Sequence, residues 1–279
     1  RHLSVSACLP WKIMAITFTN KAAGELKDRL CAMLGAEGND IWASTFHSTC
    51  ARILRRDGER IGYSSHFTIY DTDDQRRLMK NILKELNVSE KSTPPKAVLN
   101  EISRAKDSLI TPEEYEKTAG DDFRQKIIAR AYKLYQQRLR DADAMDFDDL
   151  INKTVELFRA CPDVLEYYQD RFKYLMVDEY QDTNHAQYTF VRLLAEKHQN
   201  LCVVGDDDQS IYKFRGATIE NILSFENTFQ NAQVIRLEQN YRSTQNILDA
   251  ANAVIENNTE RKGKTLWTQN GTGAQIHLH

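Results

Sequence analysis

Long hydrophobic runs are missing from this sequence of 279 residues. No stretch approaches the roughly 18 consecutive apolar residues that cross a bilayer, so no membrane partner is expected. The amino end has neither a long apolar run nor a small-residue cleavage pattern, which gives no reason to expect secretion. The expected location is therefore the cytoplasm.

Cysteine and excess positive charge are also scarce. The five cysteines are scattered without a close pair, which argues against a disulfide framework and against a zinc site. The formal net charge is −3, so the chain lacks the overall basic character of many nucleic-acid-binding proteins. Binding to nucleic acid would need a local groove. Residues 52–60 and 121–140 are basic enough to form one, although each patch is equally typical of a solvated helix face.

Apolar residues, by contrast, are plentiful and arranged in two alternating patterns. Hydrophobic residues make up 41% of the chain and charged residues 28%, which is typical of a folded globular protein. Short apolar runs at 13–18, 41–45, 174–177, 201–204 and 233–237 predict strands, with amphipathic helices between them. This alternation favours an α/β fold in which helices flank a parallel sheet.

Residues 71–141 interrupt this alternation. Amphipathic stretches such as Gln75–Leu86 and Phe123–Leu139 occur there without a convincing strand, and Pro94, Pro95 and Pro112 each indicate a helix start or break. We therefore expect an all-helical subdomain inserted into the α/β domain.

Polar side chains directly follow two of the predicted strands. Asp178 and Glu179 come after the strand at 174–177, and Gln209 lies in the polar loop after the strand at 201–204. Parallel sheets place their active sites at the carboxyl ends of strands. In a nucleotide triphosphatase, an Asp at such a position can hold Mg²⁺ and a neighbouring Glu can activate water, while a Gln could sense the terminal phosphate. Taken alone, the Asp-Glu pair is more simply explained by a surface turn at a helix start.

Two further clusters have both a plain and a functional interpretation. Tyr212, Phe214 and Arg215 could stack unpaired bases, or they could be two core aromatics beside a solvated arginine. The aspartates between Asp141 and Asp149 lack the glycine and the terminal glutamate of an EF-hand loop, so a turn and a helix start are expected there.

Six sequence blocks follow one another along the chain. They are Ala15–Ala23, Thr45–Ser48, Asp146–Leu150, Asp178–Thr183, Gly205–Tyr212 and Leu237–Ser243. In this order they resemble the successive motifs of the bacterial PcrA/UvrD/Rep family of superfamily 1 DNA helicases. The resemblance runs from Trp11 almost to the carboxyl end.

The resemblance implies a RecA-like motor domain of the P-loop NTPase type and assigns roles to matching residues. Asp178 would hold Mg²⁺, and Glu179 would act as general base for water. Gln209 would couple the γ-phosphate to the DNA groove, Arg242 would contact the γ-phosphate, and Tyr241 would lie against the nucleotide base. The path of single-stranded DNA would be lined by Phe18, Asn20, Lys21, His47, Tyr212, Phe214 and Arg215.

The implied activity is that of an ATP-dependent DNA helicase. It would use ATP and Mg²⁺, move 3′ to 5′ on single-stranded DNA and open junctions between single- and double-stranded DNA. Two alternatives stay open at this point, a non-catalytic single-stranded DNA-binding module and the helicase part of a helicase-nuclease. RNA as a substrate is open as well.

The resemblance also implies a division of the chain into domains. Residues 1–70 and 142–265 would form the two parts of motor domain 1A, and residues 71–141 would form the helical domain 1B. Residues 266–279 would begin the linker to a second motor domain.

The phosphate-binding sequence of the family, G-x-x-x-x-G-K-[ST], is absent from the chain. The twelve residues before Ile13 are too few for its strand, loop and helix, and the segment 263–265 lacks the first glycine and follows a predicted helix. We therefore expect weak or absent ATP binding and no autonomous activity. In the family this strand would lie beside the one that ends at Asp178. An exposed sheet edge, a substitute strand at His2–Cys8, or self-association by pairing with another copy is therefore expected.

Overall fold

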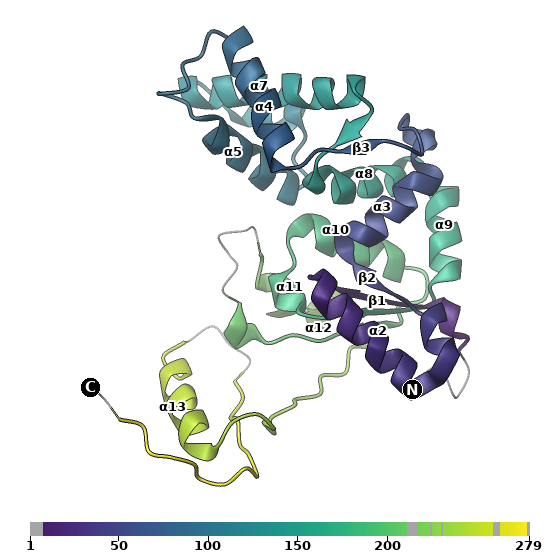
Figure 1. The fold of residues 1–279 in the computed structure, drawn as a ribbon, viewed down its shortest axis with the longest axis vertical. Coiled ribbons are helices and arrows are strands. Elements are labelled where there is room, and N and C mark those ends of the chain that lie inside the picture. Colours follow the sequence, from purple (N-terminus) through teal and green to yellow (C-terminus); the bar gives the residue numbers. More distant parts are fainter. Residues whose placement is uncertain (1–7, 211–216, 224, 230, 259–262, 278–279) are drawn as a thin grey trace.

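A computed structural model describes residues 8–210, 217–223, 225–229, 231–258 and 263–277. A group of helices lies at one end of the molecule, and a parallel sheet with its own helices lies beside it (Figure 1). Within the described residues, no helix is both long enough and apolar enough to cross a membrane.

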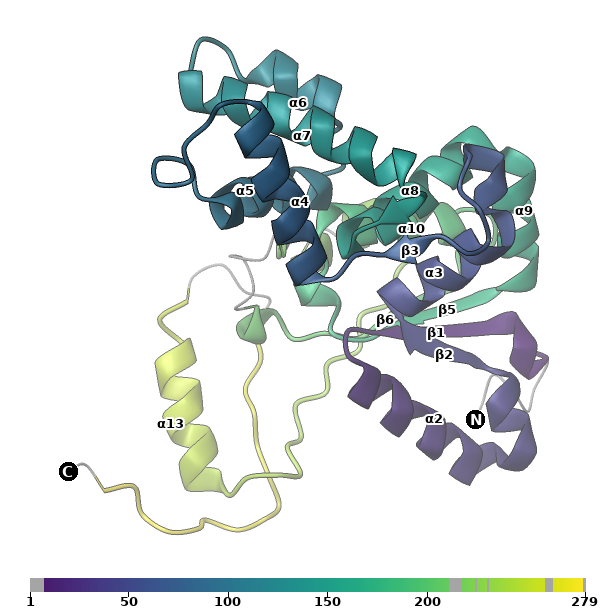
Figure 2. The same cartoon turned by 45° about the horizontal axis from the view of Figure 1, so that its top comes forward.

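The main sheet has four parallel strands in the order β2-β1-β5-β6. All five residues of β1 are buried, because this strand lies inside the sheet and helices cover both of its faces (Figure 2). The predicted α/β class, a parallel sheet flanked by helices with a helical insertion, is confirmed. The strands are β1 (Ile13–Thr17), β2 (Trp42–Thr45), β5 (Tyr174–Val177) and β6 (Leu201–Val203).

Five helices flank this sheet, with α2 on one face and the other four on the opposite face (Figures 1 and 2). Helices α2 and α3 start almost directly after strands, because a threonine caps each of them. Thr19 Oγ1 accepts from the backbone N–H of Ala22 at 3.1 Å, and Thr45 Oγ1 accepts from that of Ser48 at 3.2 Å. The helices are α2 (Asn20–Leu34), α3 (Phe46–Asp57), α8 (Phe147–Ala160), α9 (Pro162–Arg171) and α10 (His185–Ala195).

Short 3-10 helices connect these elements. They are η1 (Pro10–Lys12), η2 (Gly35–Asp40), η3 (Gly58–Ile61), η4 (Tyr180–Asp182) and η5 (Asp207–Gln209). Two of them, η4 and η5, directly follow the loops at the carboxyl ends of β5 and β6, so they help to shape that edge of the sheet.

The insertion consists of helices packed around a core of their own, which includes Met79, Ile102 and Tyr135. Pro95 and Pro112 stand at the first positions of two of these helices, as predicted. The helices are α4 (Thr72–Glu85), α5 (Pro95–Asp107), α6 (Pro112–Thr118) and α7 (Phe123–Asp141).

A two-stranded parallel pair closes the base of the insertion. β3 (Thr68–Ile69) lies just before its first helix, and β4 (Ala144–Met145) lies just after its last. The chain therefore leaves the α/β domain and returns to it at neighbouring points. Sequence patterns did not predict this pair, because two residues are too few to show an alternation.

The carboxyl part differs from expectation. The predicted strand at 233–237 is wrong: these residues form no sheet pairing, and Ile235 and Leu237 are 80% and 78% exposed. An apolar run becomes a strand when a neighbouring strand offers hydrogen bonds, and no described strand does so here. In both views α13 lies apart from the sheet (Figures 1 and 2). The helices here are α11 (Glu220–Leu223), α12 (Phe225–Thr228) and α13 (Gln245–Ile255).

The expected position of a gap in the sheet is also corrected. The strand that ends at Asp178 has neighbours on both sides, β1 and β6, so no gap lies beside it. Among the described residues, the strands that lack a partner on their outer side are β2 and β6, at the two edges of the sheet. The substitute strand predicted at His2–Cys8 falls almost entirely outside the described residues.

Candidate functional site

The loop after β5 carries two carboxylates in a constrained conformation. The backbone N–H of Asp178 donates to Ile16 O at 3.0 Å, which extends the β1–β5 pairing to the end of the strand. Asp178 Oδ1 accepts from the backbone N–H of Glu179 at 3.1 Å. Burial raises the pKa of Asp178 above its ordinary value, although the hydrogen bond from the backbone N–H of Glu179 acts in the opposite direction. Glu179 has φ +50° and ψ +41°, a left-handed conformation that is uncommon away from glycine.

Gln181 joins this loop to the one that follows β6. Its Nε2 donates to Glu179 Oε2 at 2.9 Å, and its Oε1 accepts from the backbone N–H of Asp206 at 3.0 Å. Gln181 is 1% exposed, whereas Glu179 is exposed, so the bridge is buried on the glutamine side. A Cβ on Gly205 would lie 2.6 Å from Gln181 Oε1, so glycine is needed for the loops to approach this closely. The sequence did not predict this role for Gln181, because a single glutamine two residues after the glutamate forms no distinctive pattern.

The loop after β6 places Gln209 beside an aspartate. Gln209 Nε2 donates to Asp206 Oδ2 at 2.8 Å, and Lys264 contacts the same carboxylate. Burial opposes ionisation of Asp206, but the hydrogen bonds from Lys264 and Gln209 outweigh it and lower the pKa of this carboxyl. Lys264 thereby links the carboxyl segment to the sheet edge.

A cavity of about 1280 Å³ connects these loops to aromatic side chains. Glu179 and Gln209 line one part of it, and Phe18 and His47, which follow β1 and β2, line another. All four residues follow parallel strands at their carboxyl ends, which explains how segments far apart in the sequence share one cavity.

The two aromatic side chains Phe18 and His47 each pack against another aromatic ring. Phe18 packs edge-on against the buried Phe46, with ring centroids 5.4 Å apart. His47 packs edge-on against Phe147 at 6.0 Å. Burial lowers the pKa of His47 below its ordinary value, although Asp148 acts in the opposite direction. His47 is therefore a neutral ring at pH 7.

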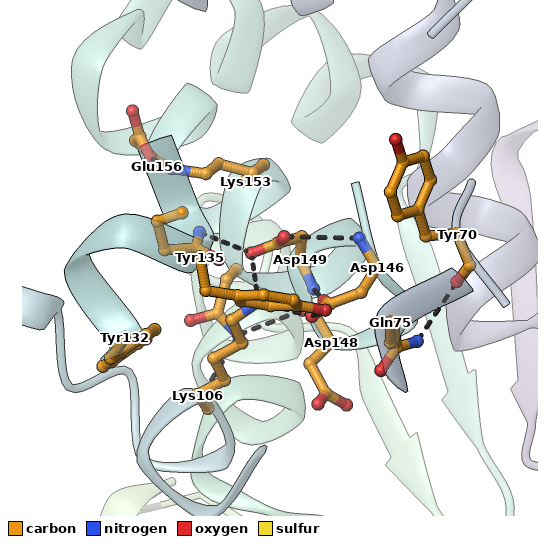
Figure 3. A network of polar contacts seen from close by, with 12 residues as sticks. Tyr70, Gln75, Lys106, Tyr132, Tyr135, Asp146, Asp148, Asp149, Lys153 and Glu156 are labelled. Atoms are coloured by element: carbon orange, nitrogen blue, oxygen red, sulfur yellow. Dashed lines mark hydrogen bonds and ion pairs between the residues drawn. The ribbon is translucent and has the colours of Figure 1, made fainter. Parts of the chain in front are cut away.

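A buried ionic network joins the insertion to α8 (Figure 3). Lys106 Nζ, at the end of α5, lies 2.7 Å from Asp146 Oδ2 and 2.9 Å from Asp149 Oδ1. Tyr135 OH donates to Asp146 Oδ2 at 3.0 Å, and Gln136 Nε2 donates to Asp149 Oδ1 at 3.0 Å. The lysine side chain is 1% exposed, so its charge is neutralised by these carboxylates rather than by water.

The charges in this network depend on one another. Burial disfavours the charged form of Lys106, but the two aspartates outweigh it and raise the pKa of the lysine. Burial, and then Asp149, raise the pKa of Asp146 above its ordinary value, while Lys106 acts in the opposite direction. Asp146 also caps α8, in agreement with the helix start predicted for this aspartate-rich segment. The sequence predicted a helix start in this segment, but it did not predict that Lys106 would contact the aspartates.

The other predicted residues lie in three different situations. Asn20 and Lys21 are exposed at the start of α2, next to Thr19, which lines the cavity. Tyr241 and Arg242 are exposed and do not line it. The structure therefore brings Glu179 and Gln209 together, with Asp178 adjacent, and does not bring Arg242 to them. The reason is that residues 233–237 lack strand pairing and do not carry the following segment to the sheet. Tyr212, Phe214 and Arg215 lie outside the described residues.

The donor atoms at the strand ends suit a hard divalent cation better than they suit ATP phosphates. Carboxylate oxygens such as those of Asp178 are the protein ligands that Mg²⁺ prefers. Asp206, Asp207 and Asp208 also bring three carboxylates within 4.8 Å of one another, and Lys264 contacts this group. No G-x-x-x-x-G-K-[ST] sequence is present to cradle phosphates.

Comparison with known proteins agrees with this arrangement. Residues 1–230 match the family described as UvrD/REP helicase N-terminal domain, and residues 235–279 match the UvrD-like helicase C-terminal domain. The chain is 57% identical over 270 residues to the ATP-dependent DNA helicase PcrA of Bacillus subtilis (strain 168), covering 97% of this chain and 36% of that protein. It is 55% identical over 268 residues to the PcrA of Leuconostoc citreum, covering 96% of this chain and 36% of that protein.

These relatives are much longer than the sequence described here. The chain spans about 36% of the length of the curated relatives it matches. Family membership does not depend on that share, because the N-terminal domain match alone covers 230 of the 279 residues. The chain belongs to the UvrD/REP helicase family.

Proposed function

We propose that this chain forms the DNA-gripping and water-activating part of an ATP-dependent DNA helicase. The observation that carries the proposal is the single cavity lined by Glu179 and Gln209 in one part and by Phe18 and His47 in another. A motor that couples hydrolysis to movement needs the hydrolytic groups and the DNA-binding groups in physical contact. The names of the PcrA relatives agree with this activity.

The proposed roles follow from the positions of the side chains. Glu179, fixed by Gln181, orients and deprotonates the attacking water, and Asp178 is the carboxylate that holds Mg²⁺. When bound, Mg²⁺ would neutralise charge that develops on the phosphate oxygens. Gln209 is proposed to couple the γ-phosphate, near Asp178 and Glu179, to the DNA groove near Phe18 and His47. Tyr241 and Arg242 are proposed to contact the nucleotide, which requires their segment to approach the cavity.

Phe18 and His47 are proposed to stack on unpaired bases, because both line the cavity and burial favours the neutral form of His47. Asn20 and Lys21 are proposed to continue the DNA path at the start of α2, and Tyr212, Phe214 and Arg215 to extend it. In this proposal residues 71–141 form domain 1B, residues 1–70 and 142–265 form domain 1A, and residues 266–279 begin a linker.

The finer activity is proposed by resemblance to the family. It comprises 3′ to 5′ translocation on single-stranded DNA and unwinding at junctions between single- and double-stranded DNA, in the cytoplasm. The unpartnered outer side of β6 is also available for pairing with another copy of the chain.

DNA binding is tested by fluorescence anisotropy with a labelled oligothymidylate. We expect Phe18→Ala to weaken binding about tenfold, because one base loses its stacking surface. Phe123→Ala is the matched control, since Phe123 is 79% exposed on the insertion and does not line the cavity. Circular dichroism checks that both variants fold. Equal affinities for the two variants would contradict the proposed DNA path.

ATP hydrolysis is tested separately, with and without the same oligonucleotide. We expect the chain to bind DNA without DNA-stimulated turnover, because it has no G-x-x-x-x-G-K-[ST] loop to hold the phosphates. Stimulated turnover that Glu179→Gln abolishes would show that the loop is dispensable.

One alternative has a structural observation in its favour. A non-catalytic single-stranded DNA-binding module would need Phe18 and His47 but not Arg242, and Arg242 lies away from the cavity. The alternatives differ in the behaviour of Glu179→Gln when the chain is supplied with ATP. DNA-stimulated turnover that Glu179→Gln abolishes would exclude the non-catalytic module, because only a helicase part uses Glu179 to activate water.

A further inference from the structure

Helix α5 of the insertion presents a stripe of polar side chains to the cavity. Lys96, Asn100, Ser103 and Arg104 all line it. Their spacing of four, three and one residues puts them on one face of a helix. The stripe therefore forms a wall of the cavity that belongs to the insertion, while Phe18 and His47 belong to the α/β domain.

The opposite face of α5 fixes the orientation of this stripe. Val98 and Ile102 are each 1% exposed and belong to the core of the insertion. The helix cannot rotate about its axis without exposing them, so Lys96 and Arg104 are held toward the cavity. The packing of the apolar face therefore determines which way the polar stripe faces.

The end of α5 is fastened to the α/β domain at two points. Lys106 is buried between Asp146 and Asp149 of α8, as described above. Asp107 Oδ1 accepts from Asn184 Nδ2 at 2.5 Å, and Asn184 caps α10. These contacts place the stripe in a fixed position relative to Phe18 and His47, which favours binding of a ligand without prior rearrangement.

Charge within the cavity is unevenly distributed. The two cations of the stripe, Lys96 and Arg104, are exposed, whereas the carboxylates that line the cavity belong to other positions: Asp107, Asp148, Glu179, Asp182 and Asp208. Arg104 Nη1 also lies 3.0 Å from Glu101 Oε1, but its side chain is 64% exposed and its remaining donors are accessible. A polyanion is attracted to the stripe and repelled from these carboxylates.

We propose that Lys96 and Arg104 bind the phosphate backbone of single-stranded DNA along α5, while the bases turn inward to Phe18 and His47. The two cations are separated by about 12 Å along the helix axis, so they engage two different phosphates. The aspartates keep the backbone at the rim of the cavity. The inference rests on the proposed function, because it adds a second wall to the same DNA path.

The experiment compares two double variants of the full chain. Lys96→Gln with Arg104→Gln removes the charges of the stripe. Arg76→Gln with Lys84→Gln removes two exposed charges with the same eight-residue spacing on α4, which does not line the cavity. Arg76 also has a carboxylate three residues away, as Arg104 has, so the control matches that pairing.

Affinity for oligothymidylate and oligocytidylate is measured over a series of salt concentrations. We expect the α5 variant to bind about tenfold more weakly than the unsubstituted chain, equally for both sequences. The slope of log affinity against log salt concentration should become shallower by about 1.4, because two phosphate contacts are lost. The α4 variant should keep both the affinity and the slope.

The outcomes separate this inference from the proposed function. If the chain binds DNA and Phe18→Ala weakens it, but the α5 variant keeps its affinity and salt slope, the second wall is wrong and the proposed function stands. An equal loss in both double variants would also overturn the inference, because general charge would then explain it. If the unsubstituted chain binds neither oligonucleotide, the proposed function fails and this inference fails with it.

Discussion

The carboxylate of Asp107 accepts a hydrogen bond of 2.5 Å from the side-chain amide of Asn184. The first residue ends α5 of the insertion, and the second caps α10, the helix that follows the Glu179 loop. Burial, and then Asp148, raise the pKa of Asp107 to about 7. A contact between the insertion and the start of α10 therefore contains a carboxyl group whose pKa lies near neutral pH.

The pH dependence of stability follows from this pKa. The folded state holds the Asp107 proton more tightly than the unfolded state, whose pKa is near 3.8, so stability falls as the pH rises between these values and levels off above about 7. Asp107→Asn removes this loss and keeps an acceptor for Asn184. We expect the free energy of unfolding of this variant, measured by thermal denaturation, to exceed that of the unsubstituted chain by about 1–2 kcal/mol near pH 8 and to differ little near pH 4. An equal gain at both values would contradict the titration.

Removing the buried lysine should be far more damaging than removing a surface one. Lys106→Met leaves Asp146 and Asp149 buried without their cation, which should lower the free energy of unfolding by about 3–5 kcal/mol. Arg60→Met is the control, because Arg60 and Asp163 form an exposed pair at 2.8 Å that contributes little. Urea denaturation near pH 7 measures both. Similar losses of unfolding free energy in the two variants would show that the buried network stabilises the fold no more than an exposed ion pair does.

Two glycines should respond to alanine in opposite directions. Gly205→Ala would place a Cβ 2.6 Å from Gln181 Oε1 and 2.8 Å from Ile222 Cδ1, so we expect a loss of about 1–3 kcal/mol in the free energy of unfolding. Gly24 lies in α2 with no atom within 4 Å of its added Cβ, and Gly24→Ala should add about 0.5–1 kcal/mol. Denaturation of both variants checks the signs. A neutral Gly205→Ala would mean that the Gln181 bridge is not closely packed.

Neutralising an acid of the cavity should tighten DNA binding. Asp148 lines the cavity near His47, and Asp148→Asn removes a charge that repels the phosphate backbone. We expect a gain of about two- to fivefold in affinity at low salt, which shrinks as salt is added. Asp73→Asn, at an exposed position on α4, is the control and should change little. A gain that persists unchanged at high salt would point to a cause other than charge.

Much of the α/β fold could be predicted from local patterns. The strand at 174–177 was predicted with the bounds that the structure has, because a run of apolar residues bordered by charges fits no amphipathic helix. Pro95 and Pro112 marked helix starts because proline lacks the N–H that a helix interior needs. Asp178, Glu179 and Gln209 were predicted as candidates because they follow strands, and the structure brings the last two into one cavity.

The prediction that failed shows where local patterns stop. Residues 233–237 have the composition of a strand but form none, because pairing depends on a neighbour that local sequence does not specify. The partners of Lys106 could not be predicted either, because local sequence does not specify contacts between distant residues. They lie 40 and 43 residues away along the chain and meet it through the packing of two domains.

The sequence by itself determined the alternation of strands and helices, the helix starts and the polar residues that follow each strand, since these depend on neighbours a few residues apart. The tertiary structure alone decided which strand ends share a cavity, that Gln181 bridges two loops and that α5 faces Phe18 and His47. Such contacts join residues that are distant in the chain, and their geometry is set by how the insertion packs on the sheet domain.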